Sequence, residues 1–162
     1  MKIPEFKITE AKDIFFDIPF KAAGNYGKVP FKPKFLVAHY TAGRSFQSTV
    51  ERFQQSDTKA SAHLVVGRKG EVVQMVPFNR PAWHAGSDSN LNYTYKDTNE
   101  SHMFGRMNFY SFGVEFDNYG PLTKVGKKFK TWFGRTVSFD EVVEVDPNLS
   151  TSFSVPYWHA YS

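Results

Sequence analysis

The chain contains 162 residues, of which 41% are apolar, and carries a formal net charge of +4. This length provides one globular domain with a full hydrophobic core and is too short for two ordinary domains. The sequence has no cysteine, which excludes disulfide bonds and thiolate metal ligands, so any metal must be held by His, Asp or Glu. Residues 1–10 mix charge and proline with no apolar run, and we therefore expect neither a signal peptide nor a membrane-spanning segment.

Aromatic residues are unusually abundant, with seventeen Phe, eight Tyr and three Trp. Such side chains fill cores, but a surplus also lines grooves that bind sugars or peptides. One basic run contains interleaved aromatic residues, which is compatible with a nucleic-acid patch, although a solvated hairpin face is the favoured interpretation and we expect no nucleic-acid partner. The run comprises Lys124, Lys127, Lys128 and Lys130, with Phe129 and Trp132 among them.

The first clear element is an apolar, β-prone segment from Phe35 to Ala38, bounded by Pro33 and Gly43. It is too short for a helix, and we predict a buried strand. His39 follows where this strand ends, a position from which a polar side chain projects from a rigid element into a crevice of an α/β sheet. On this segment alone, a half-buried histidine satisfied by hydrogen bonds is the simpler interpretation.

A short amphipathic helix is predicted over residues 45–55. Ser48 and Glu51 have the spacing of a capping box, and apolar residues recur at i, i+4 and i+7. Residues 61–66 and 71–76 are further β-prone runs separated by an Arg-Lys-Gly turn, which predicts a hairpin.

The next segments are less regular. We predict a loop over residues 81–86, and a long polar insertion over 87–107 of the kind that is usually functional or mobile. Residues 109–116 predict a fourth long strand. Further short strands and turns are predicted between 121 and 154, over residues 128–133, 136–139 and 141–145.

The residues able to carry chemistry are five histidines and one carboxylate in an apolar strand, Glu115. If Glu115 faces a cleft, its apolar surroundings raise its pKa toward the range of a general acid or base. If it faces solvent, it is an ordinary polar residue of a half-buried strand, and the spacing is equally compatible with both. No two histidines have the spacing of a helical zinc motif, so a histidine site must be assembled from distant segments. The histidines are His39, His63, His84, His102 and His159.

Four segments follow one another in a specific order. They are Val-Ala-His-Tyr-Thr-Ala-Gly at 37–43, Ala-Ser-Ala-His-Leu-Val-Val with Gly-Glu-Val-Val-Gln at 60–74, Ala-Trp-His-Ala-Gly at 82–86, and Tyr-Ser-Phe-Gly-Val-Glu-Phe at 110–116. Together they resemble the N-acetylmuramoyl-L-alanine amidases of amidase type 2, the family of AmpD, phage lysins and peptidoglycan-recognition proteins. The turn at 118–120, the region from 126 to 134 and the pair at 157–158 resemble a subgroup with a β insertion before its last helix.

The resemblance implies a role for each matching residue. His39 corresponds to the first zinc ligand, and Glu115 to the carboxylate that acts as general base. Trp83 and His84 match a loop that lines the substrate groove, with Tyr40 as a further substrate-binding residue. His63 matches a position that is not a ligand and is expected to be structural. The implied reaction is zinc-dependent hydrolysis of the amide between N-acetylmuramic acid and L-alanine, with peptidoglycan or a muropeptide as the partner.

One part of the family pattern has no counterpart in this sequence. The family completes its zinc site with a second His and then an Asp or Cys beyond a further helix. The aromatic segment 157–161 resembles the start of that helix, and we therefore expect His159 to be a surface or groove residue rather than a ligand. Three interpretations follow: a fragment of a longer amidase, which we favour, a module that binds peptidoglycan without cleaving it, or a site completed by a second chain.

The sequence therefore predicts a single α/β domain with a mixed central β-sheet flanked by helices and a β-hairpin insertion near the C-terminus. Residues 1–33 are expected to form an arm, 34–120 the core, and 121–162 the insertion and the start of a missing last helix. We expect synthesis in the cytoplasm, either for work there or for release to the cell wall as a phage-type lysin, and no membrane partner. The alternative function is a non-catalytic peptidoglycan-binding module.

Overall fold

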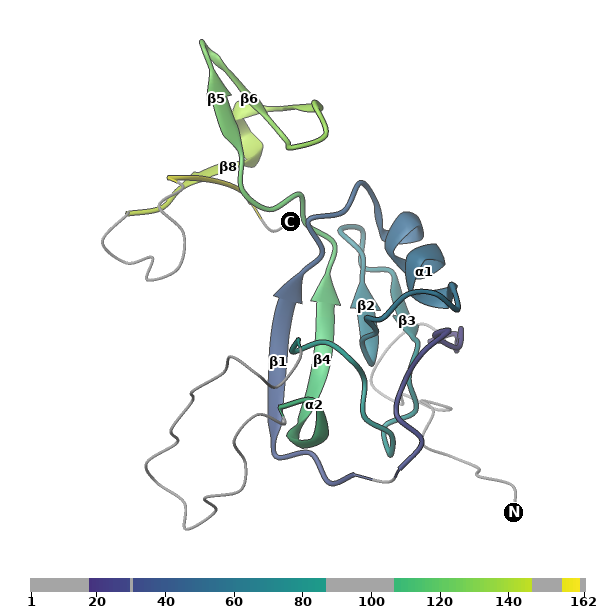
Figure 1. The fold of residues 1–162 in the computed structure, drawn as a ribbon. Coiled ribbons are helices and arrows are strands. Elements are labelled where there is room, and N and C mark those ends of the chain that lie inside the picture. Colours follow the sequence, from purple (N-terminus) through teal and green to yellow (C-terminus); the bar gives the residue numbers. More distant parts are fainter. Residues whose placement is uncertain (1–17, 30, 87–106, 147–155, 161–162) are drawn as a thin grey trace.

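The structure is a computed structural model that describes residues 18–29, 31–86, 107–146 and 156–160. A mixed four-stranded sheet forms its centre (Figure 1). β4 pairs in parallel with both β1 and β2, while β3 runs antiparallel to β2, and this arrangement confirms the predicted α/β class. In spatial order the strands are β1 (Phe35–Tyr40), β4 (Ser111–Phe116), β2 (Leu64–Val66) and β3 (Val72–Gln74).

β1 is an edge strand of the described sheet, and the prediction that it is buried is wrong for one of its two faces. Leu36 is 66% exposed, whereas Val37 and His39, which alternate with the exposed positions, are half-buried. Successive side chains of a strand project to opposite faces, so an edge strand can bury one set and expose the other. The apolar composition of β1 carries no information on how many neighbours the strand has.

α1 (Phe46–Gln54) confirms the predicted helix but uses a different cap. Ser45 is the N-cap, and its Oγ accepts a hydrogen bond from the Ser48 N–H at 3.2 Å. The Ser48 Oγ accepts from the Ser45 N–H at 3.2 Å, which completes a reciprocal capping box. The predicted box between Ser48 and Glu51 is therefore one turn too late, and Glu51 instead accepts a hydrogen bond from the exposed Gln47 amide.

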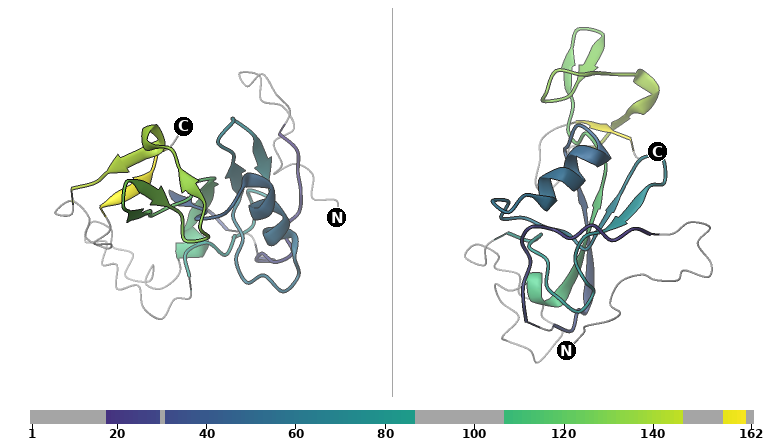
Figure 2. Two further views of the ribbon diagram at one scale, coloured as in Figure 1. Left: turned by 90° about the horizontal axis from the view of Figure 1, so that it is seen from above. Right: turned by 90° about the vertical axis from the view of Figure 1, so that its right-hand side faces the viewer.

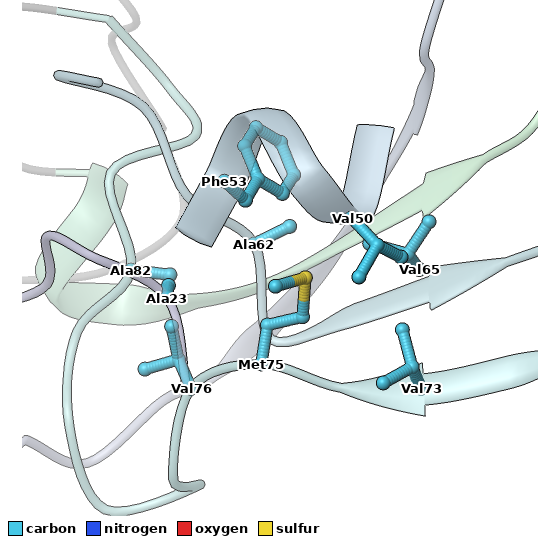
Figure 3. Close-up of a cluster of buried hydrophobic side chains, with 9 residues drawn as sticks. All are labelled: Ala23, Val50, Phe53, Ala62, Val65, Val73, Met75, Val76 and Ala82. Carbon is cyan, nitrogen blue, oxygen red and sulfur yellow. The ribbon is translucent and has the colours of Figure 1, made fainter. Parts of the chain in front are cut away.

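α1 packs on one face of the sheet over β2 and β3 (Figure 3). Val50 of α1 lies next to Val65 and above Val73 of the two strands, whereas Phe53 lies next to Ala62, just before β2, and all five side chains are buried. Burial of an aliphatic side chain of this size contributes about 1.5–3 kcal/mol. The remaining members of this core are Ala23, Met75, Val76 and Ala82.

The described part of the N-terminal arm covers the outer edge of β3. Its backbone pairs with that edge, because the Gln74 N–H donates to the Pro19 carbonyl at 3.0 Å and the Lys21 N–H donates to the Gln74 carbonyl at 2.9 Å. The arm then reaches α1, where the Gly24 N–H donates to the Phe53 carbonyl at 2.7 Å. An edge strand left open offers unpaired backbone groups to other chains, and the arm removes that exposure.

A distal lobe, formed by residues 119–146 and 156–160, lies beyond the C-terminal ends of β1 and β4 (Figures 1 and 2). It contains a three-stranded and a two-stranded sheet, which is a larger insertion than the predicted hairpin. Its core consists of Tyr119, Leu122, Phe129 and Val137. Its elements are β5 (Thr123–Val125), β6 (Lys128–Lys130), β7 (Thr136–Val137), η1 (Phe139–Glu141), β8 (Val142–Glu144) and β9 (Tyr157–His159).

Two elements differ in kind from their prediction. The segment expected to begin a last helix is the strand β9, which pairs antiparallel with β8. Residues 107–110, expected to be loop and strand, form a short helix, α2 (Met107–Tyr110), that leads directly into β4. Aromatic residues favour strands, and the partner strand β8 decides the outcome for 157–159.

Some predictions concern residues outside the described ranges. They are the first part of the arm, residues 1–17, the polar insertion at 87–106 with His102, and residues 147–155. Among the described helices, none has both the length and the apolar character needed to cross a membrane.

Candidate functional site

His39 and Glu115 occupy neighbouring strands and face the same side of the sheet. They are register partners across the parallel β1–β4 pair, and Glu115 is also the partner of Val65 on β2. Side chains of register partners project to the same face. Because Val65 is buried beneath α1, the face that carries His39 and Glu115 is the one that α1 covers in part.

His84 comes to the same face from the loop before α2. A Cβ atom on Gly113 would lie 2.4 Å from the His84 Cγ, so only glycine at this position leaves room for the imidazole. The His84 ring lies over β4, and its Nδ1 is 3.0 Å from the His39 Nε2. The absence of a side chain in the middle of β4 therefore makes the contact between the two histidines possible.

The hydrogen bonds of His84 determine its tautomer. Its Nε2 lies 3.2 Å from the Ser111 carbonyl oxygen, which can only accept, so Nε2 carries the proton. Nδ1 is then an acceptor, and the His39 Nε2–H donates to it. Burial, together with the neighbouring His39, lowers the pKa of His84 to about 4, and burial also lowers the pKa of His39. Both rings are therefore neutral at pH 7.

Glu115 has the properties of a general acid or base. Burial in apolar surroundings raises its pKa from the ordinary value of 4.5 to about 7. Its Oε2 is buried and has no hydrogen-bond partner within the described part of the chain. A buried carboxyl oxygen without a partner is costly in a purely structural residue and is expected where a substrate or water molecule completes the site.

Glu115 opens into a pocket of about 1060 Å³, here called the Glu115 pocket. The pocket also includes three residues that the sequence assigned to substrate binding, Tyr40, Trp83 and His84. The Trp83 indole N–H donates to the Asn25 Oδ1 at 3.3 Å, which links this wall to the N-terminal arm. The pocket is bordered by α1 as well as by the ends of β1 and β4, and its further lining residues are Thr41, Ala42, Gly43, Ser48, Thr49, Arg52, Phe53, Thr58, Lys59, Ala60, Ser61, Gly86, Asn108 and Trp132.

His63 lies in the interior and not in the Glu115 pocket. It is fully buried, its Nδ1 accepts from the Gly113 N–H at 3.0 Å, and its Nε2–H donates to the Arg80 carbonyl at 2.9 Å. Burial lowers its pKa to about 4. Both ring nitrogens are thus used to hold β4 and the segment before residue 81, which is the geometry of a structural residue.

His159 was expected at the surface or in a groove, and the surface part of that expectation is wrong. It is 4% exposed, on β9 of the distal lobe, and its ring lies 4.4 Å from the Tyr119 ring centroid. Its Nε2 is 3.8 Å from the Glu141 carboxylate. It borders a second pocket, of about 840 Å³, between the lobe and the start of α1.

The described residues do not fit a zinc centre of the expected kind. A catalytic zinc site takes three protein ligands and a water molecule. Across residues 18–29, 31–86, 107–146 and 156–160, no three His, Asp or Glu side chains lie close enough together to hold a metal ion. His39 and His84 are adjacent, but their facing nitrogens are joined by a hydrogen bond. His39 therefore stands as a single candidate ligand.

Asn108 is a positioning residue that the sequence did not indicate. Its Oδ1 accepts from the backbone N–H groups of His84 and Ala85 at 2.9 and 2.8 Å, and its Nδ2 donates to the Gly86 carbonyl at 3.0 Å. These three bonds fix the loop that carries His84. Nothing in the sequence singles it out, because Asn108 stands at the junction between the predicted loop over 87–107 and the predicted strand over 109–116, where an asparagine is common.

Comparison with known proteins now identifies the family. The family model described as N-acetylmuramoyl-L-alanine amidase matches residues 29–141. The chain belongs to the N-acetylmuramoyl-L-alanine amidase family. The match includes β1 through β7 and therefore all four of His39, Trp83, His84 and Glu115.

Individual amidases resemble shorter parts of the chain. The 1,6-anhydro-N-acetylmuramyl-L-alanine amidase AmpD of Salmonella typhimurium is 33% identical over 72 residues, and that of Escherichia coli K12 is 32% identical over the same length. Each match covers 44% of this chain, and the chain spans about a third of the length of these relatives.

Solved structures resemble the chain only in part. A mutant endolysin from Bacillus subtilis is 28% identical with a TM-score of 0.47, covering 62% of this chain and 60% of that one. The E. coli amidase AmiD, in complex with anhydro-N-acetylmuramic acid-L-Ala-D-γ-Glu-L-Lys, is 26% identical with a TM-score of 0.43, covering 66% of this chain and 39% of its own. The family assignment rests on the sequence match and not on these values.

Proposed function

We propose that this chain supplies the acid/base residue and much of the substrate groove of a zinc-dependent peptidoglycan amidase, which hydrolyses the bond between N-acetylmuramic acid and L-alanine. The observation that carries the proposal is Glu115, whose raised pKa and unpartnered buried Oε2 coincide with a large pocket. Family membership gives the reaction class, and the name of the AmpD relatives gives the muropeptide as a substrate class.

Glu115 is assigned the proton transfers. In its ionised form it takes a proton from the water molecule whose oxygen adds to the amide carbonyl carbon. As the C–N bond breaks, the same carboxyl returns that proton to the departing amine of L-alanine, so that acid and free amine are the products. A pKa of about 7 suits both directions near neutral pH, because a group at this value both accepts and releases the proton readily.

His84 and Asn108 are assigned positioning roles. Asn108 holds the loop, the loop holds His84, and His84 contacts His39. We assign to His39 the role of zinc ligand that the family pattern implies. The described residues contribute no further complete ligand set, so the remaining ligands come from outside them, in a further segment or a second chain.

Replacement of Glu115 tests the catalytic assignment. Glu115→Gln keeps the shape of the side chain but removes its basicity, and turnover should fall by about a hundredfold or more, the usual effect of removing a general base. Release of peptide from purified peptidoglycan and from a soluble anhydromuropeptide measures it and also shows which substrate is preferred. Glu144→Gln, at an exposed position of β8, is the matched control and should be fully active. Equal turnover of Glu115→Gln and the parent protein would remove Glu115 from the mechanism.

A second candidate function follows from the incomplete ligand set. A module that binds peptidoglycan without cleaving it needs the groove but not the metal. It predicts sedimentation with purified cell wall that is unchanged by a chelator and no release of peptide at any zinc concentration. Cleavage that a chelator stops and zinc restores would instead support the amidase.

A further inference from the structure

Trp132 is a large aromatic side chain exposed at the rim of the Glu115 pocket. It is 68% exposed and lines the same pocket as Glu115, although it comes from the distal lobe. Phe139 is 81% exposed in the same lobe but does not border this pocket. Both aromatic side chains are exposed, but only that of Trp132 lies at the Glu115 pocket.

The Trp132 ring is held in one orientation. Its Nε1–H donates to the Ala42 carbonyl oxygen at 2.7 Å, and its ring meets Phe133 edge-on, with centroids 5.3 Å apart and planes at 84°. Trp132 itself lies within a turn that is closed by the Thr131 N–H donating to the Arg135 carbonyl at 2.9 Å. An aromatic ring fixed in this way binds a ligand without the entropic cost of ordering it first.

Ala42 provides a second, independent observation. It follows β1 with a φ of 48°, the one positive φ at a non-glycine residue in the described part of the chain. This conformation is unfavourable for an alanine, and such outliers concentrate at functional sites. Ala42 also lines the Glu115 pocket, and its carbonyl is the group that anchors the Trp132 indole. The strained residue thus couples the end of β1 to the exposed ring.

The chemistry of the pocket wall indicates the kind of ligand. A flat apolar ring at the rim is combined with hydrogen-bonding side chains elsewhere around the same pocket, among them the half-buried Asn25 and the exposed Arg52 and Lys59. A pyranose ring has matching chemistry, because its C–H groups form an apolar face while its hydroxyl and acetamido groups project sideways as donors and acceptors. A stem peptide has no comparable rigid apolar face.

We propose that Trp132 is a stacking platform for a pyranose ring of the glycan strand and thereby makes the site selective for glycan-bearing substrate. This inference deepens the proposed function, since it concerns the same pocket. It assigns the end of the groove near the distal lobe to sugar and leaves the part near Glu115 to the amide. Trp132 acts as a specificity residue and takes no part in proton transfer.

The test separates sugar binding from cleavage. A tetramer of N-acetylglucosamine, which has neither lactyl group nor peptide, is titrated by calorimetry against the parent protein, Trp132→Ala, Trp132→Phe and Phe139→Ala. We expect saccharide binding by the parent protein, a weakening by about tenfold in Trp132→Ala, partial recovery in Trp132→Phe and no change in Phe139→Ala. Near-identical thermal unfolding of the variants shows that the fold is kept, and Trp132→Phe serves if the alanine variant is unfolded.

Cleavage kinetics give the second measurement. With polymeric peptidoglycan, Trp132→Ala should raise KM by about tenfold with kcat unchanged, whereas a lactyl-peptide substrate without sugar should show no change in either constant. Equal saccharide affinity of Trp132→Ala and the parent protein overturns the proposal, and so does an absence of saccharide binding by the parent protein. Concentration-dependent self-association that Trp132→Ala abolishes would show that the ring is a contact between two copies, which also overturns it.

The outcome is separable from that of the proposed function. Glu115→Gln should bind the tetramer as the parent protein does, because Glu115 is not part of the stacking platform. If no variant or parent protein cleaves peptidoglycan but Trp132 governs saccharide binding, the amidase proposal fails and the platform stands. If Glu115 governs cleavage and Trp132 has no effect on either substrate, the platform fails and the amidase proposal stands.

Discussion

Replacing Glu115 with glutamine should stabilise the folded protein at alkaline pH. The folded protein holds the Glu115 proton up to a pH of about 7, whereas the unfolded chain releases it near the ordinary value of 4.5. Between these two values the folded state binds more protons than the unfolded state, so the free energy of unfolding falls as the pH rises. Glutamine does not titrate and avoids this loss.

The size of the effect follows from the two pKa values. Their separation of about 2.5 units corresponds to at most about 3.4 kcal/mol, at 1.36 kcal/mol per unit. The Glu115 side chain is only partly enclosed and lines an open pocket, so solvent reduces this value, and we expect about 2 kcal/mol. The gain should be absent at pH values near or below 4.5, where both states are protonated.

Urea unfolding of the two proteins at about pH 4.5 and about pH 8 measures this effect. The parent protein and Glu115→Gln should unfold with similar free energies at the lower pH, and the variant should be the more stable at the higher pH. Glu144→Gln controls for the loss of a surface charge. A difference between Glu115→Gln and the parent protein that is the same at both pH values would refute the raised pKa and with it the assignment of Glu115 as a base near neutrality.

Three further predictions follow from the site and its surroundings. If turnover depends on ionised Glu115, the rate should increase about tenfold per pH unit up to a pH of about 7 and then stay constant. A pH–rate profile of the active protein measures this, and a flat profile from pH 5 to 8 contradicts it. Gly113→Ala should displace the His84 ring, which should lower the free energy of unfolding by about 1–3 kcal/mol and break the contact between His84 and His39. Thermal unfolding and imidazole NMR spectra measure these two effects, and an unchanged His84 resonance would refute the close approach. Arg68→Gln should lower the free energy of unfolding in urea by about 2–3 kcal/mol, because it leaves the buried Asp117 carboxylate without its 3.0 Å ion pair. The neighbouring Lys69→Gln should leave this free energy unchanged, and equal effects of the two substitutions would contradict a stabilising role of the ion pair.

The sequence predicted the segments that are periodic or end in strong turn residues. The helix near residues 46–54, the hairpin of β2 and β3, and the strand containing Glu115 all follow from local pattern, because the helix has a helical apolar period and the strands are short apolar, β-prone runs. Sheet order is different in kind. That β1 lies at the edge depends on which strands pair, and no local pattern encodes the pairing.

Some residues of the candidate site could likewise be predicted from local sequence, and others could not. His39 and Glu115 were found because each lies in a strand of distinctive composition, and the strand pairing then brings them into register. Asn108 and Trp132 were not assigned to the site, because their roles depend on contacts across 24 and 90 residues of sequence, with His84 and Ala42 respectively. A single sequence contains no signal for contacts of that range beyond the residue types themselves.

The distal lobe was predicted in part from local sequence, but its position relative to the site depends on long-range contacts. The sequence predicted an insertion with a solvated basic hairpin, and its strands are indeed short, with β5 exposed throughout. Its attachment to the sheet is nevertheless specific, because Arg68 bridges to Asp117 at 3.0 Å and lies 3.9 Å above the Tyr119 ring. A lobe attached to the C-terminal ends of β1 and β4 in this way brings Trp132 to the Glu115 pocket. Variation in the length or sequence of this insertion should therefore alter which substrates are bound while leaving the proton transfers of Glu115 unchanged.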